Sequence, residues 1–259
     1  MNDLFLSRRE RPGGVYAEIV LNRPAKGNAL TAPMLEELAA IVAQLAEDRG
    51  VRAVVIRGAG RFFCTGGDIG AWGALTPRQM ADEWILRGIA VLEALSALPQ
   101  PVIAAVHGHA IGGGLELAMA ADLRLGLVGA NFGTPEVCIG MISGWGGVRK
   151  LTEMVGLARA QHLTVLGSPI SAEEALRWGL ITELAATPEA FASSLENWID
   201  RLLANAPLAV TLTKKLLADS RVDARHAHAE AAAKAAATAD CAEGVRAFLA
   251  KRPPHFQNR

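Results

Sequence analysis

The fold is decided by residues 107–140, which read HGHAIGGGLELAMAADLRLGLVGANFGTPEVCIG. The glycine triplet at 112–114 leads into an apolar helix, and the leucine-rich segment 123–128 then reads as a strand. A further buried strand is predicted just before this stretch, at 102–106, because the residues there are all apolar. The order of strand, helix and strand is typical of α/β proteins.

The alternation of strands and helices continues toward the N-terminus. Apolar and β-branched residues predict strands at 16–21 and 51–57. Thr31 is the predicted N-cap of a helix from Met34 to about residue 46. Thr76 and Gln79 form a predicted capping box around Pro77, and that helix runs to about residue 98.

From residue 150 onward the chain reads as mostly helical, with helix starts at Ser171 and Thr187 and an alanine-rich helix at 224–239. No Pro/Ser-rich linker separates this part from the α/β part. We therefore expect one cooperative unit, with a core over residues 1–200 and a C-terminal helical region over 201–259.

The composition excludes several classes of protein. The chain is 51% hydrophobic, with 26 basic and 26 acidic residues, so no global charge predicts nucleic acid as a partner. No apolar run approaches the roughly 20 residues needed to span a bilayer, and residues 1–10 do not resemble a secretory signal. The scattered Cys64, Cys138 and Cys241 predict reduced thiols in the cytoplasm, with neither a disulfide framework nor a metal site.

Two glycine turns are candidates for binding a negatively charged oxygen. The first spans residues 63–68, FCTGGD, and the second spans 112–116, GGGLE. Glycine lets backbone N–H groups face a ligand, and the first N–H groups of a helix have no partner within it. Two such turns facing one point would form an oxyanion hole, although either turn alone could be purely structural. The glycine spacing does not match a dinucleotide loop or a P-loop.

Two carboxylates lie close to these glycine turns. Glu116 is at the start of the helix that follows 112–114, and Glu136 lies in a later glycine break. The strand predicted between them can return the chain to the same end of the sheet. Two carboxyl groups on one substrate can divide the roles of acid and base. The alternative is a helix-start carboxylate and a surface glutamate without a shared role.

Taken together, seven ordered segments resemble the enoyl-CoA hydratase/isomerase (crotonase) superfamily. They are NRPAKGNAL (22–30), FFCTGGDI (62–69), HGHAIGGGLELAMAAD (107–122), FGTPEVCIGM (132–141), GWGGVRKL (144–151), ISAEEALRWGLI (170–181) and EGVRAFLAKRPPHF (243–256). The resemblance implies an α/β spiral of ββα repeats whose C-terminal helices serve in trimerisation. It also implies an acyl-CoA substrate, a homotrimer or a hexamer built as a dimer of trimers, and no cofactor beyond the coenzyme A of the substrate.

The resemblance further implies roles for individual residues. The oxyanion-hole N–H groups would belong to Thr65 and Gly113. In a hydratase adding water to a 2-trans-enoyl-CoA, Glu116 would activate the water and Glu136 would deliver a proton to the α-carbon. The coenzyme A moiety would contact Lys26, Gly66, Gly67, Asp68, Ile69, Phe248 and Lys251, the last two in some relatives from a neighbouring subunit. For Lys251, a solvated surface lysine is the alternative.

Two features leave the reaction and the substrate open. Trp145 replaces a small residue that family hydratases often have beside the acyl site, and it could narrow the pocket or pack away from it. The loop 71–84 is variable in the family, so its tryptophans carry no assigned role. The alternatives to a hydratase are a Δ3-Δ2 enoyl-CoA isomerase, another specialised enzyme of this type, and a non-catalytic binding protein.

Overall fold

The central element of the computed structural model, which describes residues 2–218 and 224–258, is a six-stranded sheet with the order β1-β2-β3-β4-β6-β9. The strands are β1 (Leu4–Arg11), β2 (Gly14–Leu21), β3 (Val51–Gly58), β4 (Val102–Val106), β6 (Leu123–Leu127) and β9 (Glu183–Ala185). β1 and β2 form an antiparallel hairpin, and every following neighbour in the sheet is parallel. β1 was not predicted, because most of its residues are polar or charged.

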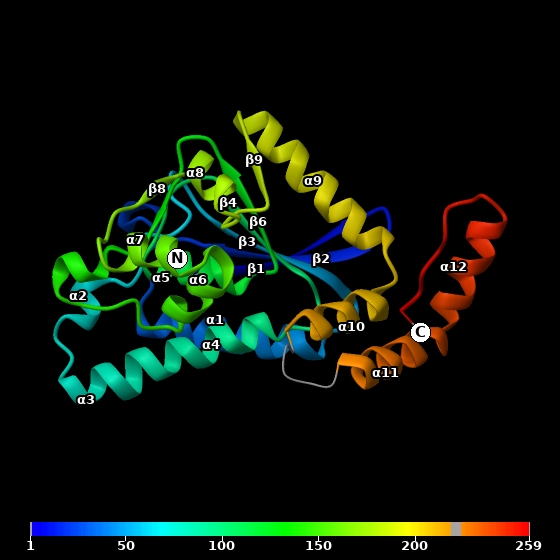
Figure 1. Cartoon of the computed structure of the whole chain (residues 1–259), viewed down its shortest axis with the longest axis horizontal. Helices are drawn as coiled ribbons and strands as arrows, with labels where there is room; N and C mark the ends of the chain where they lie inside the picture. Colours follow the sequence, from blue (N-terminus) through cyan, green and yellow to red (C-terminus); the bar gives the residue numbers. More distant parts are fainter. Residues whose placement is uncertain (1, 219–223, 259) are drawn as a thin grey trace.

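Helices cover both faces of this sheet, as Figure 1 shows. Side chains of a strand alternate between the two faces, and in β3 Val54 and Ile56 belong to one core cluster while Val55 belongs to the other. The first cluster is completed by α1 (Ala32–Glu47) and α4 (Leu86–Ser96). The second is closed by α9 (Pro188–Ala204). Burial on both faces explains why β3 and β4 are almost continuously apolar.

A second, smaller sheet gives the fold its spiral character. It contains β5 (Ala110–Ile111), β7 (Asn131–Gly133) and β8 (Ile170–Ser171). Isolated bridges extend it, joining Leu30 to Gly67 and Cys64 to Ala110. Each turn of the chain therefore adds a segment to the large sheet and then one to the small sheet before a helix follows. The predicted spiral of ββα repeats is confirmed, and it places the two glycine turns side by side.

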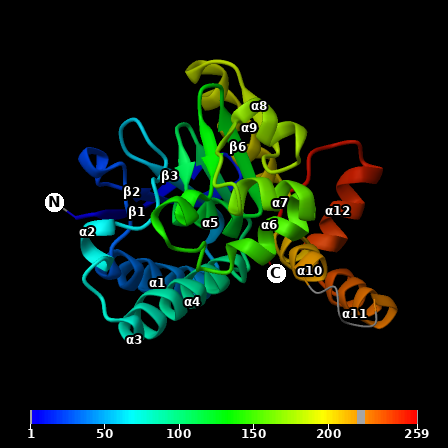
Figure 2. The same ribbon diagram turned by 60° about the vertical axis from the view of Figure 1, so that its left-hand side comes forward.

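The remaining helices lie beyond these two sheets. They are η1 (Pro24–Lys26), α2 (Ile69–Trp72), α3 (Pro77–Gln79), the π-helical η2 (Met80–Ile85), α5 (Gly113–Ala120), η3 (Pro135–Ile139), α6 (Gly147–Val155), α7 (Leu157–Thr164), α8 (Ala172–Arg177), α10 (Pro207–Ala218), α11 (Ala224–Ala236) and α12 (Ala239–Leu249). α11 and α12 lie at the end of the molecule opposite α2 (Figures 1 and 2). The expected division at residue 200 falls inside α9, and it stays a prediction.

Several helix starts agree with their sequence signals. The side chain of Thr31 accepts a hydrogen bond from the N–H of Met34, and Thr76 and Gln79 form the reciprocal capping box. Thr187 caps α9 in the same way. Over the residues described above, no helix is both long and apolar enough to cross a membrane.

Candidate active site

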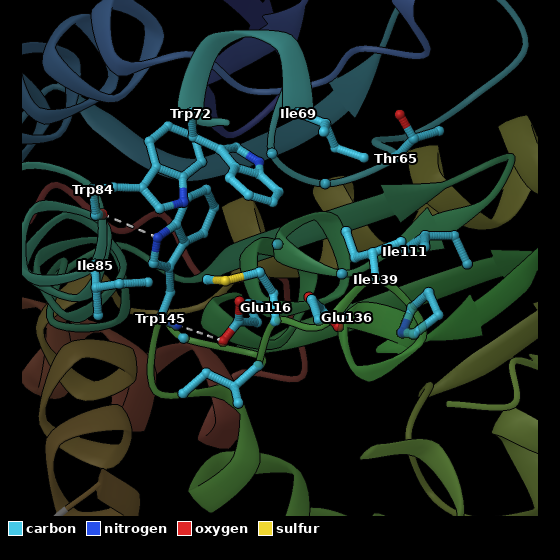
Figure 3. Close-up of a pocket in the computed structure, with 18 of the residues that line it drawn as sticks. Thr65, Ile69, Trp72, Trp84, Ile85, Ile111, Glu116, Glu136, Ile139 and Trp145 are labelled. Atoms are coloured by element: carbon cyan, nitrogen blue, oxygen red, sulfur yellow. Dashed lines mark hydrogen bonds between the residues drawn. The ribbon is translucent and has the colours of Figure 1, made fainter. Parts of the chain in front are cut away.

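A cavity of about 300 Å³ opens between the two glycine turns, α2, η2, α5 and η3 (Figure 3). Its wall is mostly apolar, and Glu116 and Glu136 are the charged residues in it. The residues lining it are Thr65, Gly66, Gly67, Ile69, Trp72, Trp84, Ile85, Ile111, Gly112, Gly113, Glu116, Pro135, Glu136, Cys138, Ile139, Met141, Ile142, Gly144 and Trp145. A concave apolar site with a few polar groups is the usual form of a small-molecule site.

The two glycine turns are packed against each other. A Cβ on Gly66 would lie 3.0 Å from the carbonyl oxygen of Ile111 and 3.4 Å from the nitrogen of Gly113, and Gly66 has a φ of +101°. Glycine is therefore required there by both space and conformation. Gly113 is the first residue of α5, so its N–H has no acceptor within the helix. Among the described residues, no other backbone acceptor is recorded for it.

The structure contradicts the prediction that the N–H of Thr65 belongs to the oxyanion hole. That N–H donates to the carbonyl oxygen of Gly27 at 3.0 Å, so it is not available to a ligand. Gly67 lies two residues after Thr65, and Leu30 bonds to the residues on either side of it. The N–H of Leu30 donates to the carbonyl oxygen of Gly66, and the carbonyl oxygen of Leu30 accepts from the N–H of Asp68. Within the described chain, the N–H of Gly67 has no recorded backbone partner. Gly67 is thus the residue of this turn whose N–H is available beside Gly113.

Glu116 is held rigidly at the bottom of the cavity. Its Oε1 accepts hydrogen bonds from the N–H groups of Trp145 and Gly147, both at 2.8 Å. Only 4% of the residue is exposed. Burial, helped by the charge of Glu136 and opposed by these hydrogen bonds, raises the pKa of Glu116 to about 7. The carboxyl group is therefore near its titration midpoint at neutral pH, with Oε2 left for other contacts.

Glu136 faces the same space from η3 (Figure 3). Its Oε2 is buried, and no partner for it is found among the described residues. A Cβ on Gly112 would lie 2.8 Å from its Oε1, so the glycine there allows the close approach of the carboxyl group. Burial raises the pKa of Glu136 above its ordinary value. A buried polar atom without a partner is a group prepared to bond to a ligand or water.

Three tryptophans form one wall of the cavity, and no role was predicted for two of them. Trp72 comes from α2, Trp84 from η2 and Trp145 from the turn before α6. Trp145 is buried, which settles the question left open by the sequence in favour of a pocket-lining position. Gly88 was the available signal, since a glycine within a helix leaves room for a large ring, and here that ring is the indole of Trp145.

Cys64 and Asn28 support the first glycine turn without facing the cavity. Cys64 is fully buried, and burial raises the pKa of its thiol to about 12, so the expectation of an unreactive buried residue agrees with the structure. The side chain of Asn28 donates to the carbonyl oxygens of Ala59, Phe62 and Phe63. Asn28 therefore fixes the segment that leads into the turn.

The structure does not bring every predicted site residue to the cavity. Asp68 caps α2 and pairs with Arg23 at 2.8 Å, so its side chain has a structural role. Lys26 is exposed on η1, next to Gly27, to which the first glycine turn is bonded. Phe248 and Lys251 lie at the end of α12 and just beyond it, far from the cavity of this chain (Figure 2).

Comparison with known proteins is consistent along the whole chain. A family model described as enoyl-CoA hydratase/isomerase matches residues 10–259. The probable enoyl-CoA hydratase of Bacillus subtilis (strain 168) is 36% identical over 240 residues, which are 91% of this chain and 92% of that protein. The crotonyl-CoA hydratase of Syntrophomonas wolfei is 35% identical over 259 residues, which are 98% and 97% of the two chains. The crystal structure of an enoyl-CoA hydratase from Bacillus anthracis matches with a TM-score of 0.93 at 31% identity, covering 100% of both chains.

Proposed function

The chain belongs to the enoyl-CoA hydratase/isomerase family, and from this premise we propose that it is an enoyl-CoA hydratase, a lyase. It adds water across the double bond of a 2-trans-enoyl-CoA to give a 3-hydroxyacyl-CoA. The observation that carries the proposal is the meeting of Glu116 and Glu136 in one apolar cavity beside the unpartnered N–H of Gly113. An isomerisation needs only one such carboxylate, whereas hydration needs a base for water and an acid for the α-carbon.

The N–H groups of Gly113 and Gly67 hold the thioester oxygen in this proposal. Negative charge moves onto that oxygen when a nucleophile adds to the β-carbon of the enoyl group. Donors that are already in place stabilise this charge without reorganisation, and losing one typically costs about 10²–10³ in rate. Because Gly113 lies at the start of α5, the positive end of the helix dipole also stabilises the negative charge on the thioester oxygen.

Glu116 is the general base for water in this mechanism. Its Oε1 is fixed by two backbone N–H groups, so Oε2 faces the substrate in one orientation. A pKa of about 7 makes it a stronger base than an ordinary carboxylate while leaving a large ionised fraction at neutral pH. Glu116 removes a proton from the water, and the resulting C–OH bond forms at the β-carbon.

Glu136 is the general acid that completes the addition. Burial raises the pKa of Glu136 above that of an ordinary glutamate, and its buried Oε2 has no competing partner among the described residues. The proton passes to the α-carbon as the enolate collapses, so one molecule of water is added in total. Because the two carboxyl groups interact, the pair titrates together and the two roles belong to its singly protonated state.

The coenzyme A moiety and the assembly are also part of the proposal. Lys26 and the 66–69 loop would contact the nucleotide, since the loop lines the cavity and Lys26 precedes Gly27, which accepts a hydrogen bond from Thr65 at the start of that loop. Phe248 and Lys251 would contact it only from a neighbouring copy, within a homotrimer or a dimer of trimers. Phe248 is 83% exposed in the single chain, which supports burial against a partner. We also propose a cytoplasmic location, a role in fatty acid metabolism, and no metal or separate cofactor.

The test is the hydration of crotonyl-CoA, followed by the loss of absorbance of the conjugated enoyl thioester. The wild type should turn over, and Glu116→Gln and Glu136→Gln should each lose about 10²–10⁴ in kcat. Glu189→Gln, an exposed glutamate at the start of α9, is the matched control and should retain the rate.

Two results would remove the proposal. One is the absence of hydration with short, long and branched enoyl-CoAs alike. The other is full hydratase activity in Glu116→Gln. A Glu116→Ala variant that keeps the isomerisation of a 3-enoyl-CoA would instead assign the chain to the isomerases of the family.

A further inference from the structure

The inner wall of the cavity is made of indole rings packed on glycines. In Figure 3, Trp72, Trp84 and Trp145 gather on one side of the cavity, across from Thr65 and Ile111. The centroids of the Trp84 and Trp145 rings are 5.1 Å apart, with an interplanar angle of 53°. Such tilted contacts are favourable for aromatic pairs and add rigidity to the wall.

The ring of Trp145 is locked in place from several directions. Its Nε1 donates to the carbonyl oxygen of Trp84 at 3.2 Å. The indole nitrogen fills the space where Gly88 lacks a side chain, and a Cβ on Gly113 would lie 2.6 Å from the benzene part of the ring. Only 5% of Trp145 is exposed. The ring therefore cannot swing aside without breaking a buried hydrogen bond.

A second contact closes the wall beside this ring. Ile85, the last residue of the π-helical η2, packs closely on Gly144. A Cβ on Gly144 would overlap the terminal carbon of the Ile85 side chain. π-Helical turns often occur at functional sites, because the extra residue redirects the side chains that follow it. Here the turn brings both Trp84 and Ile85 to the cavity. The wall thus comes from two segments that hold each other in place.

Trp145 also lies beside the reacting groups themselves. Its ring contacts Gly113, the proposed donor to the thioester oxygen, and its backbone N–H bonds to Glu116, the proposed base at the β-carbon. Trp145 therefore bounds the cavity beside the groups that would act on the α- and β-carbons. Among the described residues that line the cavity, the charged ones are both acidic, so an acyl chain ending in a carboxylate would meet repulsion.

We propose that Trp145 is a specificity-determining residue that limits the substrate to short, uncharged acyl chains such as the four-carbon crotonyl group. This inference rests on the proposed function and names its substrate class. Longer chains would have to displace a locked ring, and each misfitting methylene in an apolar pocket costs about tenfold or more in kcat/KM.

The experiment measures kcat/KM for 2-trans-enoyl-CoAs of four, six, eight and ten carbons, and for an enoyl-CoA ending in a carboxylate. The kcat/KM of the wild type should be at least about tenfold lower for the eight-carbon substrate than for the four-carbon substrate. Trp145→Ala should raise the ratio of eight-carbon to four-carbon kcat/KM by at least about tenfold, and Trp145→Leu should raise it less. Trp178→Ala is the matched control, since Trp178 makes an edge-to-face contact with His162 outside the cavity, and it should leave the ratio unchanged.

Equal wild-type activity on four and eight carbons would overturn the inference, as would an unchanged ratio in both Trp145 variants. Trp145→Phe keeps a ring and guards against misfolding, and it should stay close to the wild-type ratio. Calorimetric binding of butanoyl-CoA and octanoyl-CoA separates this inference from the hydratase proposal. If no enoyl-CoA is hydrated but Trp145→Ala binds octanoyl-CoA more tightly than the wild type does, then the hydratase proposal fails and the role of Trp145 stands.

Discussion

Replacing Glu116 by glutamine should stabilise the protein at alkaline pH, although it removes a group of the active site. The pKa of Glu116 is about 7 in the folded chain against 4.5 for an ordinary glutamate, with burial as the largest cause. Between these two values the folded state binds more protons than the unfolded state. The free energy of unfolding therefore falls as the pH rises from about 4.5 to about 7, and it stays lowered above that.

The size of the effect follows from the shift in pKa. A difference of about 2.5 units at about 1.4 kcal/mol per unit gives roughly 3 kcal/mol of lost stability above neutral pH. Glutamine keeps an Oε1 that can accept from the N–H groups of Trp145 and Gly147, so the local geometry is retained. It does not ionise, so Glu116→Gln should gain up to about 3 kcal/mol over the wild type at pH 8.5 and little at pH 4.5.

The assay is urea unfolding of both proteins at several pH values and one fixed protomer concentration, because assembly shifts apparent stability. Glu189→Gln is the control of opposite sign, since contacts at the start of α9 lower the pKa of that exposed carboxyl. The free energy of unfolding of Glu189→Gln should therefore show no gain over the wild type as the pH rises. A Glu116→Gln difference that is constant with pH, or that falls, would refute the reasoning.

Three further outcomes can be checked. Asn28→Ala should lower the free energy of unfolding by about 2–4 kcal/mol in urea, because the carbonyl oxygens of Ala59, Phe62 and Phe63 lose the buried side chain that donates to them; a loss below 0.5 kcal/mol would argue against that network. Gly114→Ala should lower the free energy of unfolding by about 1–3 kcal/mol or more in the same assay, since the new Cβ would overlap the carbonyl oxygen of Cys64. An unchanged free energy of unfolding would contradict that contact. The kcat/KM for crotonyl-CoA should follow a bell-shaped pH profile whose falling limb lies near pH 7, where the active, singly protonated pair loses its last proton. In Glu136→Gln only a rising limb below pH 7 should remain, because the charge of Glu136 no longer raises the pKa of Glu116; a limb that stays at pH 7 would show that the two groups do not interact.

Much of the fold could be predicted from residues whose local signals agree with their place in the structure. The apolar segment at β4 is buried on both faces, and Thr31, Thr76 and Thr187 cap the helices that follow them. β1 could not be found in this way. It lies at the edge of the sheet and pairs with β2 alone, and its last five residues are all polar or charged, so it carries no sustained apolar pattern.

The candidate site was predictable where a residue's role follows from its position in a motif. Glu116 and Glu136 enter the cavity as expected from their glycine-rich surroundings. Thr65 was the wrong donor because a motif does not show where each N–H points, and only the bond to Gly27 reveals that this one is taken. The positions of Trp84 and Trp145 depend on contacts between distant segments, which no local pattern records.

The most direct test of the account is a crystal structure of the protein with acetoacetyl-CoA, a stable analogue of the acyl substrate. The account predicts the thioester oxygen at about 2.7–3.1 Å from the nitrogens of both Gly67 and Gly113. The carboxyl group of Glu116 should then face the β-carbon, and that of Glu136 should face the α-carbon. A thioester oxygen bound to neither of these nitrogens, or an acyl group lying outside the tryptophan-lined cavity, would contradict it.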